Sequence, residues 1–286
     1  MKKFFMLFIA AIAALTIVSC NKDDKKVDPT GGVDVCPNNL VAYFPLNSAE
    51  DCIVTGEGVT FDGIGGTAKF GIGARGGCYE STGDVNTQAY LKLNVPANFV
   101  RPLSSFTLSA WIFPNDYRGG IFTVGSSDAV VDANWGALDL FLDGGNDDNG
   151  ATLKGYFYND NTSAEWHGFY PWVNGITKLT WQFVTMTYDE NSSMLMLYVN
   201  GAKVYEQTVQ LRDDATALAG KITMLNATNC YIGAFAQRMT GASAEEWLSF
   251  FSGKIDEIRL FNKGLSETEV AQLYRAEVAV TDGLDK

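Results

Sequence analysis

Asp256 and Glu257 are neighbouring acids near the C-terminus, and a pair of carboxylates is what hydrolysis of a glycosidic bond requires. The two carboxyl groups must converge on one bond, roughly 5–10 Å apart. Residues 254–261 alternate like a strand, so successive side chains point to opposite faces of a sheet. Asp256 and Glu257 therefore diverge, and neither has an acidic neighbour on its own face. We interpret Asp256 as structural and Glu257 with Arg259 as an exposed ion pair.

The residues after this strand predict a helix. Ser266 and Glu269 have the spacing of a capping box, and Leu265 and Val270 have that of a hydrophobic staple. An apolar stripe at i, i+3 and i+4 follows, formed by Val270, Leu273 and Tyr274. The pattern predicts a single short helix that packs against a sheet.

The N-terminal residues predict export. Residues 1–19 carry two lysines and then an apolar run that is shorter than the roughly 20 residues of a membrane span. The ending TIVSC resembles the lipobox of bacterial lipoproteins, which implies cleavage after residue 19 and a lipid on Cys20. A plain signal peptide or an uncleaved anchor is the alternative. Residues 20–35 are polar and contain Pro29 and two glycines, which predicts a flexible tether.

The motif NKDDKK after Cys20 resembles the acidic tag of surface lipoproteins in Bacteroidetes-type bacteria. The resemblance implies a lipid-anchored protein of the outer membrane that is exposed on the cell surface. The net charge is −12, and it becomes −14 once residues 1–19 with their two lysines are removed. Such a charge argues against nucleic acid as a partner, and it leaves the lipid as the link to a membrane.

Four cysteines remain besides Cys20: Cys36, Cys52, Cys78 and Cys230. An even number of cysteines in an exported protein favours two disulfides. Three pairings are possible, and we favour Cys36–Cys52 with Cys78–Cys230. Metal binding is the weaker alternative, because the sequence has no C-x-x-C motif and a single histidine.

Short apolar runs separated by Gly, Asn and Asp turns predict ten or more strands. Asn200-Gly201 lies between two alternating runs and predicts a tight hairpin, because both residues tolerate a positive φ. One clear helix and many strands favour an all-β jelly-roll sandwich of two antiparallel sheets with one short C-terminal helix. The expected strands are residues 40–46, 89–95, 106–114, 120–126, 137–143, 153–159, 181–189, 194–209, 230–235 and 254–261.

Four blocks, FTLSAWIFPND, WQFVTMTYDENSSMLMLYVNGAKV, CYIGA and FSGKIDEIRLFNKGLSETEVAQLY, occur in this order. They resemble successive blocks of the laminin-G-like, concanavalin A-like lectin/glucanase jelly roll. The resemblance extends from residue 40 to residue 275 and makes residues 36–286 one domain. It implies two curved antiparallel sheets with adjacent first and last strands, and it places Asp256 in the closing strand.

Calcium is an open question. Members of this family that bind calcium use a region resembling a-x-F-D-G, whereas Ser81 and Thr82 stand at the Phe and Asp positions here and only Gly83 matches. Threonine is a poor calcium ligand, because the ion prefers carboxylate and carbonyl oxygens. Asp84 and the acidic turn at residues 143–150 are alternatives, and for that turn plain exposure is the favoured interpretation. We predict no cofactor, with Ca²⁺ as the alternative.

The aromatic segment at residues 163–175 contains glycine and proline, which predicts a surface loop. Flat aromatic faces suit sugar rings, and indole N–H and tyrosine O–H groups can hydrogen bond to hydroxyls. The alternative is that these rings close one end of the sandwich. The predicted ligand-binding residues are Trp135, Trp166, His167, Tyr170 and Trp172.

The sequence contains no run of acids at alternating strand positions, no serine nucleophile elbow and no phosphate loop. We therefore predict a non-catalytic, lectin-like carbohydrate-binding surface lipoprotein. A protein–protein or adhesion module on the same fold is the alternative, and a glycoside hydrolase is the less favoured one. The expected partner is a glycan or a surface protein.

Overall fold

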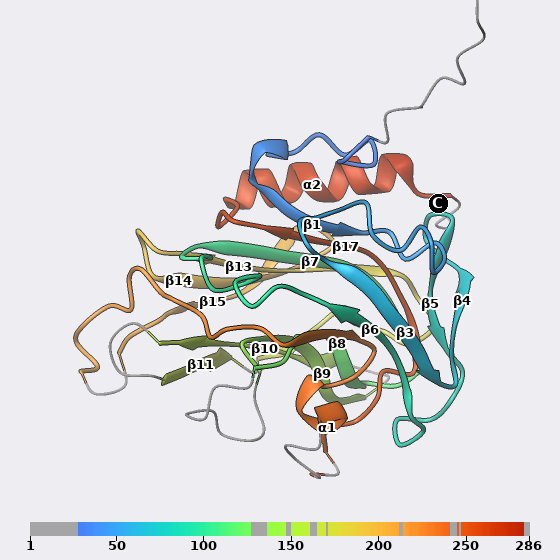
Figure 1. Cartoon of the computed structure of the whole chain (residues 1–286). Coiled ribbons are helices and arrows are strands. Elements are labelled where there is room, and N and C mark those ends of the chain that lie inside the picture. Colours follow the sequence, from blue (N-terminus) through green and yellow to red (C-terminus); the bar gives the residue numbers. More distant parts are fainter. Residues whose placement is uncertain are drawn as a thin grey trace, which may run out of the picture.

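The computed structural model describes residues 28–126, 136–146, 150–160, 165–169, 171–211, 214–240, 245 and 247–282. Its strands form two antiparallel sheets stacked face to face, which confirms the predicted jelly-roll sandwich (Figure 1). The predicted signal peptide and Cys20 lie outside the described residues, as do Trp135 and Tyr170.

Sheet A runs in the order β15-β14-β13-β7-β17-β1-β2, with β5 pairing to β17 and β4 pairing to β5. Its strands are β1 (Leu40–Phe44), β2 (Thr55–Gly56), β4 (Ala68–Ile72), β5 (Gly77–Ser81), β7 (Phe106–Pro114), β13 (Gln182–Asp189), β14 (Met194–Val199), β15 (Ala202–Thr208) and β17 (Gly253–Phe261). The closing strand β17 lies between β7 and β1, so the adjacency of first and last strands is confirmed.

Sheet B runs in the order β11-β10-β9-β8-β16-β6-β3, with β12 pairing to β10. Its strands are β3 (Thr60–Gly66), β6 (Ala89–Asn94), β8 (Arg118–Val124), β9 (Leu138–Asn146), β10 (Gly150–Asn159), β11 (Glu165–Phe169), β12 (Trp172–Val173) and β16 (Asn229–Ile232). Strand alternation directs Leu140 and Leu153 into the core between the sheets, where Phe157 packs 5.5 Å from Phe106 and 5.1 Å from Tyr188 between ring centroids. Each such buried side chain stabilises the fold by about 1.5–3 kcal/mol.

Helix α2 (Glu267–Val280) covers the outer face of sheet A (Figure 1). The Ser266 side chain accepts a hydrogen bond from the Glu269 amide, and the Glu269 side chain accepts one from the Ser266 amide, which confirms the capping box. Val270 and Leu273 are buried against Trp111 of β7 and Phe183 of β13. Among the described residues, neither helix has the length and apolarity needed to cross a membrane.

The predicted hairpin is confirmed, because Asn200 and Gly201 connect β14 to β15 with φ values of 50° and 76°. Other elements differ from expectation. Strands β3 and β4 were not among the expected strands. Residues 165–169 form strand β11 rather than a loop, because this segment pairs along the edge of β10.

The tether predicted at residues 20–35 ends earlier than expected. Val33 is buried in the cluster beneath α2. The Thr55 hydroxyl donates a hydrogen bond to the Pro29 carbonyl over 2.7 Å. Residues 28–35 therefore belong to the folded domain, whose boundary we had placed at residue 36.

The outer face of sheet B is only partly covered. The segment that contains α1 (Ala236–Thr240) packs there, with Phe235 and Leu248 buried against Phe141 of β9. The Thr123 hydroxyl of β8 donates to the Ala234 carbonyl and thereby fixes this segment to the sheet. Among the described residues, Trp172 of β12 is not part of this cluster and is 45% exposed.

Replacing Ser266 with alanine should lower the free energy of unfolding by about 1 kcal/mol, because the Glu269 amide loses its capping partner. Urea denaturation measures the change. Thr268→Ala, at an exposed position of the same turn, is the control. Equal effects of the two substitutions would contradict a capping role.

Candidate functional site

Trp172 is the predicted ligand-binding residue that the structure shows at the surface. Its side chain is 45% exposed. The residue lies in β12 opposite Thr152 of β10, whose neighbour Leu153 points into the core. Trp172 and Thr152 therefore share the outer face of sheet B. Trp166 lies in β11 opposite Tyr158, and its side chain is outside what the structure describes.

His167 is not at the surface, contrary to our prediction. Only 7% of it is exposed, and its ring lies 5.3 Å from that of Phe157 between centroids. The two residues are cross-strand partners on β11 and β10, so His167 shares the inward direction of Phe157. Burial in the sandwich leaves no surface from which His167 can contact a ligand.

Charged residues continue from Trp172 across the same end of sheet B. Lys154 of β10 forms an ion pair with Asp143 of β9, and Asp143 is the cross-strand partner of the exposed Arg118 on β8. Their neighbour Leu142 points into the core, so these side chains lie on the outer face. We name this surface the sheet B row; it consists of Arg118, Asp143, Thr152, Lys154 and Trp172.

Aromatic rings lie beside the sheet B row. The Lys154 ammonium group is 6.0 Å from the centroid of the Phe141 ring, which stacks on Tyr156 at 5.7 Å. Phe141 is buried and Tyr156 is half-buried, so Tyr156 is the ring that a ligand can touch there. A surface that combines an aromatic face with charged hydrogen-bonding groups suits a polyhydroxylated ligand.

A pocket of about 360 Å³ adjoins Arg118 at this end of the sandwich. Tyr117 and Lys178 also line it, and the Lys178 ammonium group lies 4.8 Å from the Tyr117 ring centroid. Arg118 and Lys154 were not among the predicted site residues, and Asp143 was considered only as part of the acidic turn at residues 143–150. The sequence feature that could have indicated Asp143 and Lys154 is that each is a charged residue in an otherwise apolar, alternating strand.

Asp139 is a buried carboxyl group on the same strand as Asp143. It is fully buried, and burial raises its pKa to about 8. Its Oδ2 accepts a hydrogen bond from the Gly136 amide, and its Oδ1 has no hydrogen-bond partner among the described residues. A raised pKa is a feature of catalytic acids, but a substrate cannot reach a group with no exposed surface.

Asp84, in the region considered for calcium, forms hydrogen bonds within its own turn. The Asp84 carboxylate accepts hydrogen bonds from the Asn86 and Thr87 amides over 2.8 and 3.0 Å. These bonds to its own turn hold the pKa of Asp84 below the usual value. Within the described ranges, no three His, Cys, Asp or Glu side chains are grouped as they would be around a metal ion.

The four cysteines are free thiols in the structure, so the predicted disulfides are not formed. Cys230 faces the core between the sheets, whereas Tyr79 occupies the inward position of β5 and turns the adjacent Cys78 to the other face. Cys52 likewise lies in that core, while the Cys36 thiol donates to Glu269 at the start of α2. In each proposed pair the two thiols are therefore on different sides of sheet A.

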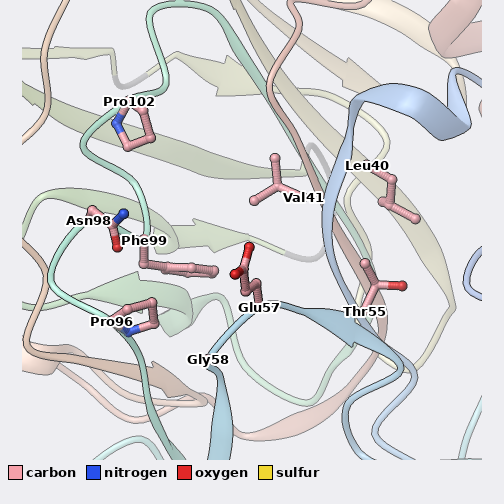
Figure 2. Close-up of a pocket in the computed structure, with 9 residues that line it drawn as sticks. All are labelled: Leu40, Val41, Thr55, Glu57, Gly58, Pro96, Asn98, Phe99 and Pro102. Carbon is pink, nitrogen blue, oxygen red and sulfur yellow. The ribbon is translucent and has the colours of Figure 1, made fainter.

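A groove of about 600 Å³ lies at the opposite edge of the sandwich, where β1, the β2–β3 turn and the residues after β6 meet (Figure 2). Apolar side chains form much of its lining, and the Glu57 side chain is directed into it. The lining residues are Leu40, Val41, Thr55, Glu57, Gly58, Pro96, Asn98, Phe99 and Pro102.

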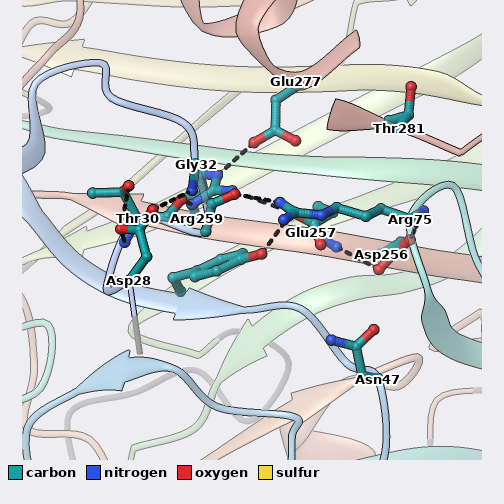
Figure 3. A network of polar contacts seen from close by, with 12 residues as sticks. Asp28, Thr30, Gly32, Asn47, Arg75, Asp256, Glu257, Arg259, Glu277 and Thr281 are labelled. Atoms are coloured by element: carbon teal, nitrogen blue, oxygen red, sulfur yellow. Dashed lines mark hydrogen bonds and ion pairs between the residues drawn. The ribbon is translucent and has the colours of Figure 1, made fainter. Parts of the chain in front are cut away.

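Asp256 and Glu257 belong to a buried polar network beneath α2 (Figure 3). The Asp256 carboxylate accepts hydrogen bonds from the Arg75 and Glu257 amides over 3.0 and 2.8 Å. Glu257 has a φ of 49° and lies at a bulge in the pairing of β17 with β7. Asp256 thus stabilises the backbone of this bulge.

The Glu257–Arg259 ion pair exists, but it is buried rather than exposed as we expected. Arg259 Nη2 lies 3.1 Å from Glu257 Oε2, and Arg259 Nε donates to Glu277 of α2. Arg259 Nη1 also donates to the Thr30 carbonyl over 2.8 Å. Alternating charges on a strand resemble a solvated face, but α2 and the residues near Thr30 cover this face. Burial, together with the charge of Glu277, raises the pKa of Glu257.

Replacing Arg259 with methionine should lower the free energy of unfolding by about 3–5 kcal/mol, because it leaves Glu277 buried without its cation and Glu257 with only the more distant Arg75. Lys203→Met is the control, since its ion pairs with Glu206 and Glu267 are at the surface. We expect the control to cost less than about 1 kcal/mol. Similar losses in both variants, measured by urea denaturation, would rule out this role of Arg259.

Asp139→Asn should change how stability depends on pH. The pKa of Asp139 is higher in the folded state than in the unfolded state, so the contribution of Asp139 to the free energy of unfolding falls as the pH rises from roughly 4 to 8. A difference of one bound proton between the folded and unfolded states changes the free energy of unfolding by about 1.4 kcal/mol per pH unit. The variant should lack this slope in urea titrations across that range, while Asp34→Asn, at an exposed position, should retain it. A wild-type slope in the Asp139 variant would contradict the assignment.

Comparisons with known proteins agree with this architecture. Residues 85–271, more than half of the chain, match the family model of the concanavalin A-like lectin/glucanases superfamily. None of the curated proteins with which the sequence was compared matches it.

Among solved structures, the binding domain of Paraclostridial Mosquitocidal Protein 1 and that of botulinum neurotoxin serotype G both superpose with a TM-score of 0.56. Their identities are 14% and 15%; 83% of this chain is covered in each case, and it spans about half of each of those chains (52% and 51%). Domain 4 of AbnA, a GH43 extracellular arabinanase from Geobacillus stearothermophilus, was solved with arabinotriose. It has a TM-score of 0.50 and 20% identity, covering 82% of this chain and 98% of that domain. These likenesses show the fold, and the family match shows that the chain belongs to the concanavalin A-like lectin/glucanases superfamily.

Proposed function

We propose that this protein is a non-catalytic carbohydrate-binding module and that the sheet B row is its glycan-binding surface. The observation that carries the proposal is the exposed Trp172 beside Thr152, next to the Lys154–Asp143 ion pair. Helix α2 covers the outer face of sheet A, whereas on the outer face of sheet B Trp172 keeps 45% of its surface exposed. Extended strands also offer a long surface along which several sugar units can lie.

The chemistry of the sheet B row fits a sugar chain. The apolar face of a sugar ring packs against an indole, and the surrounding hydroxyls need donors and acceptors. Lys154 and Arg118 supply donors, and Asp143 supplies acceptors. Asp143 and Lys154 are about one-third and one-fifth exposed, so their positions are fixed before a ligand arrives and little side-chain freedom is lost on binding.

The arabinanase domain supports a carbohydrate ligand, because nearly its whole length superposes on this chain and its structure contains arabinotriose. A non-catalytic role is supported by the acids of sheet B. Asp143 is paired with Lys154, and Asp139 is inaccessible. Hydrolysis would need two accessible carboxyl groups facing one bond.

We further propose that the protein is a lipoprotein anchored through Cys20 to the outer membrane and exposed on the cell surface. The sequence of residues 1–26 supports this placement, since it combines a signal-like apolar run, the TIVSC ending and the NKDDKK motif. In this arrangement the domain would hold extracellular glycan close to the cell.

A glycan array with the full-length protein tests the proposal. Trp172→Ala should weaken binding to the best glycan roughly fivefold or more, because the stacking face is lost. Leu218→Ala removes another exposed apolar side chain and should leave the affinity unchanged. Binding that is indifferent to Trp172→Ala would place the site elsewhere, and no binding to any glycan would overturn the proposed function.

A further inference from the structure

The groove in Figure 2 has the character of a binding site that is separate from the sheet B row. Its volume of about 600 Å³ lies within the usual range for ligand pockets, roughly 300–1,000 Å³. Val41, Pro96, Phe99 and Pro102 give it an apolar lining. Such pockets typically combine an apolar surface with a few polar groups that orient the ligand.

Glu57 supplies the charge in this groove. Its side chain is exposed, enters the groove from the turn between β2 and β3, and forms no hydrogen bond or ion pair with the described residues (Figure 2). Asn98, on the other side of the groove, also has no side-chain hydrogen-bond partner among the described residues. In the part of the chain that the structure describes, no cationic side chain lines the groove. The Glu57 carboxylate is therefore available to a ligand that lies on the apolar lining of the groove.

The net charge of the whole protein favours a cationic ligand in this groove. A net charge of −12 attracts cations over distances beyond direct contact and repels anionic groups. A single carboxylate is too few ligands for calcium or another hard metal ion. An organic cation on an apolar stem matches both the apolar lining of the groove and the Glu57 carboxylate. Lysine and arginine have this composition, because aliphatic stems carry their charged groups.

We propose that this groove is a docking site for a lysine or arginine side chain of a protein partner. The aliphatic stem packs on Val41 and Pro96, which are partly exposed, and the cationic group pairs with Glu57. The edge of β1 and β2 forms one wall of the groove, so the partner's chain passes along this side of the sandwich. The sheet B row lies at the opposite edge, so a glycan and this partner can bind at the same time.

Short peptides test the proposal on the full-length protein. The probes are acetyl-Val-Lys-Val-amide and its norleucine analogue, which keeps the stem and lacks the charge. NMR titration at millimolar peptide should shift the Asn98 side-chain amide and the Phe99 ring with the lysine peptide. The norleucine peptide should bind roughly threefold to fivefold more weakly, as expected for one partly exposed ion pair, and added salt should remove the difference.

Glu57→Gln should lower the affinity for the lysine peptide by the same factor and leave that for the norleucine peptide unchanged. Asp51→Asn, at an exposed acid outside the groove lining, is the matched control and should behave like wild type. Equal binding of the two peptides, indifference to Glu57→Gln, or the absence of shifts at Asn98 and Phe99 would each overturn the proposal. None of these results bears on glycan binding, which Trp172→Ala tests separately.

Discussion

Arg259 is a buried cation in the closing strand, and α2, the N-terminal segment and β1 meet around its guanidinium group. Glu257 comes from the same strand, Glu277 from α2, and the Thr30 carbonyl from the N-terminal segment. The Tyr43 ring of β1 lies 3.7 Å from the guanidinium carbon. A buried charge is costly without partners, so each segment must occupy its place for the others to remain folded.

This constraint determines which surfaces are free. It holds α2 on the outer face of sheet A and the segment at residues 28–33 beside it, so neither surface is open to a ligand. It also fixes β1 next to β17, which places the wall of the groove that contains Glu57. The outer face of sheet B does not take part in the network. That face carries an exposed tryptophan and an ion pair, and there we propose the glycan-binding surface.

Features set by neighbouring residues could be predicted from the sequence. The capping box at Ser266 and the turn at Asn200-Gly201 depend on local backbone geometry, and both are confirmed. Strand β3 was missed because Gly63 and Gly65 favour turns in isolation, whereas pairing with β6 holds them extended.

Features that depend on tertiary cover could not be predicted. His167 is buried because β11 pairs with β10, and Glu257 and Arg259 are buried because a helix and an N-terminal segment lie over them. The sheet B row joins residues from β8, β9, β10 and β12, and only the register of these strands brings Arg118 and Asp143 near Trp172. Single-strand patterns carry no information about that register.

The measurement that tests the central claim most directly is a crystal structure of the protein with its best-binding oligosaccharide. We predict a sugar ring packed against Trp172, with hydroxyl groups hydrogen-bonded to Lys154 and Asp143. An oligosaccharide bound instead in the groove beside Glu57, or on a surface away from sheet B, would contradict this account.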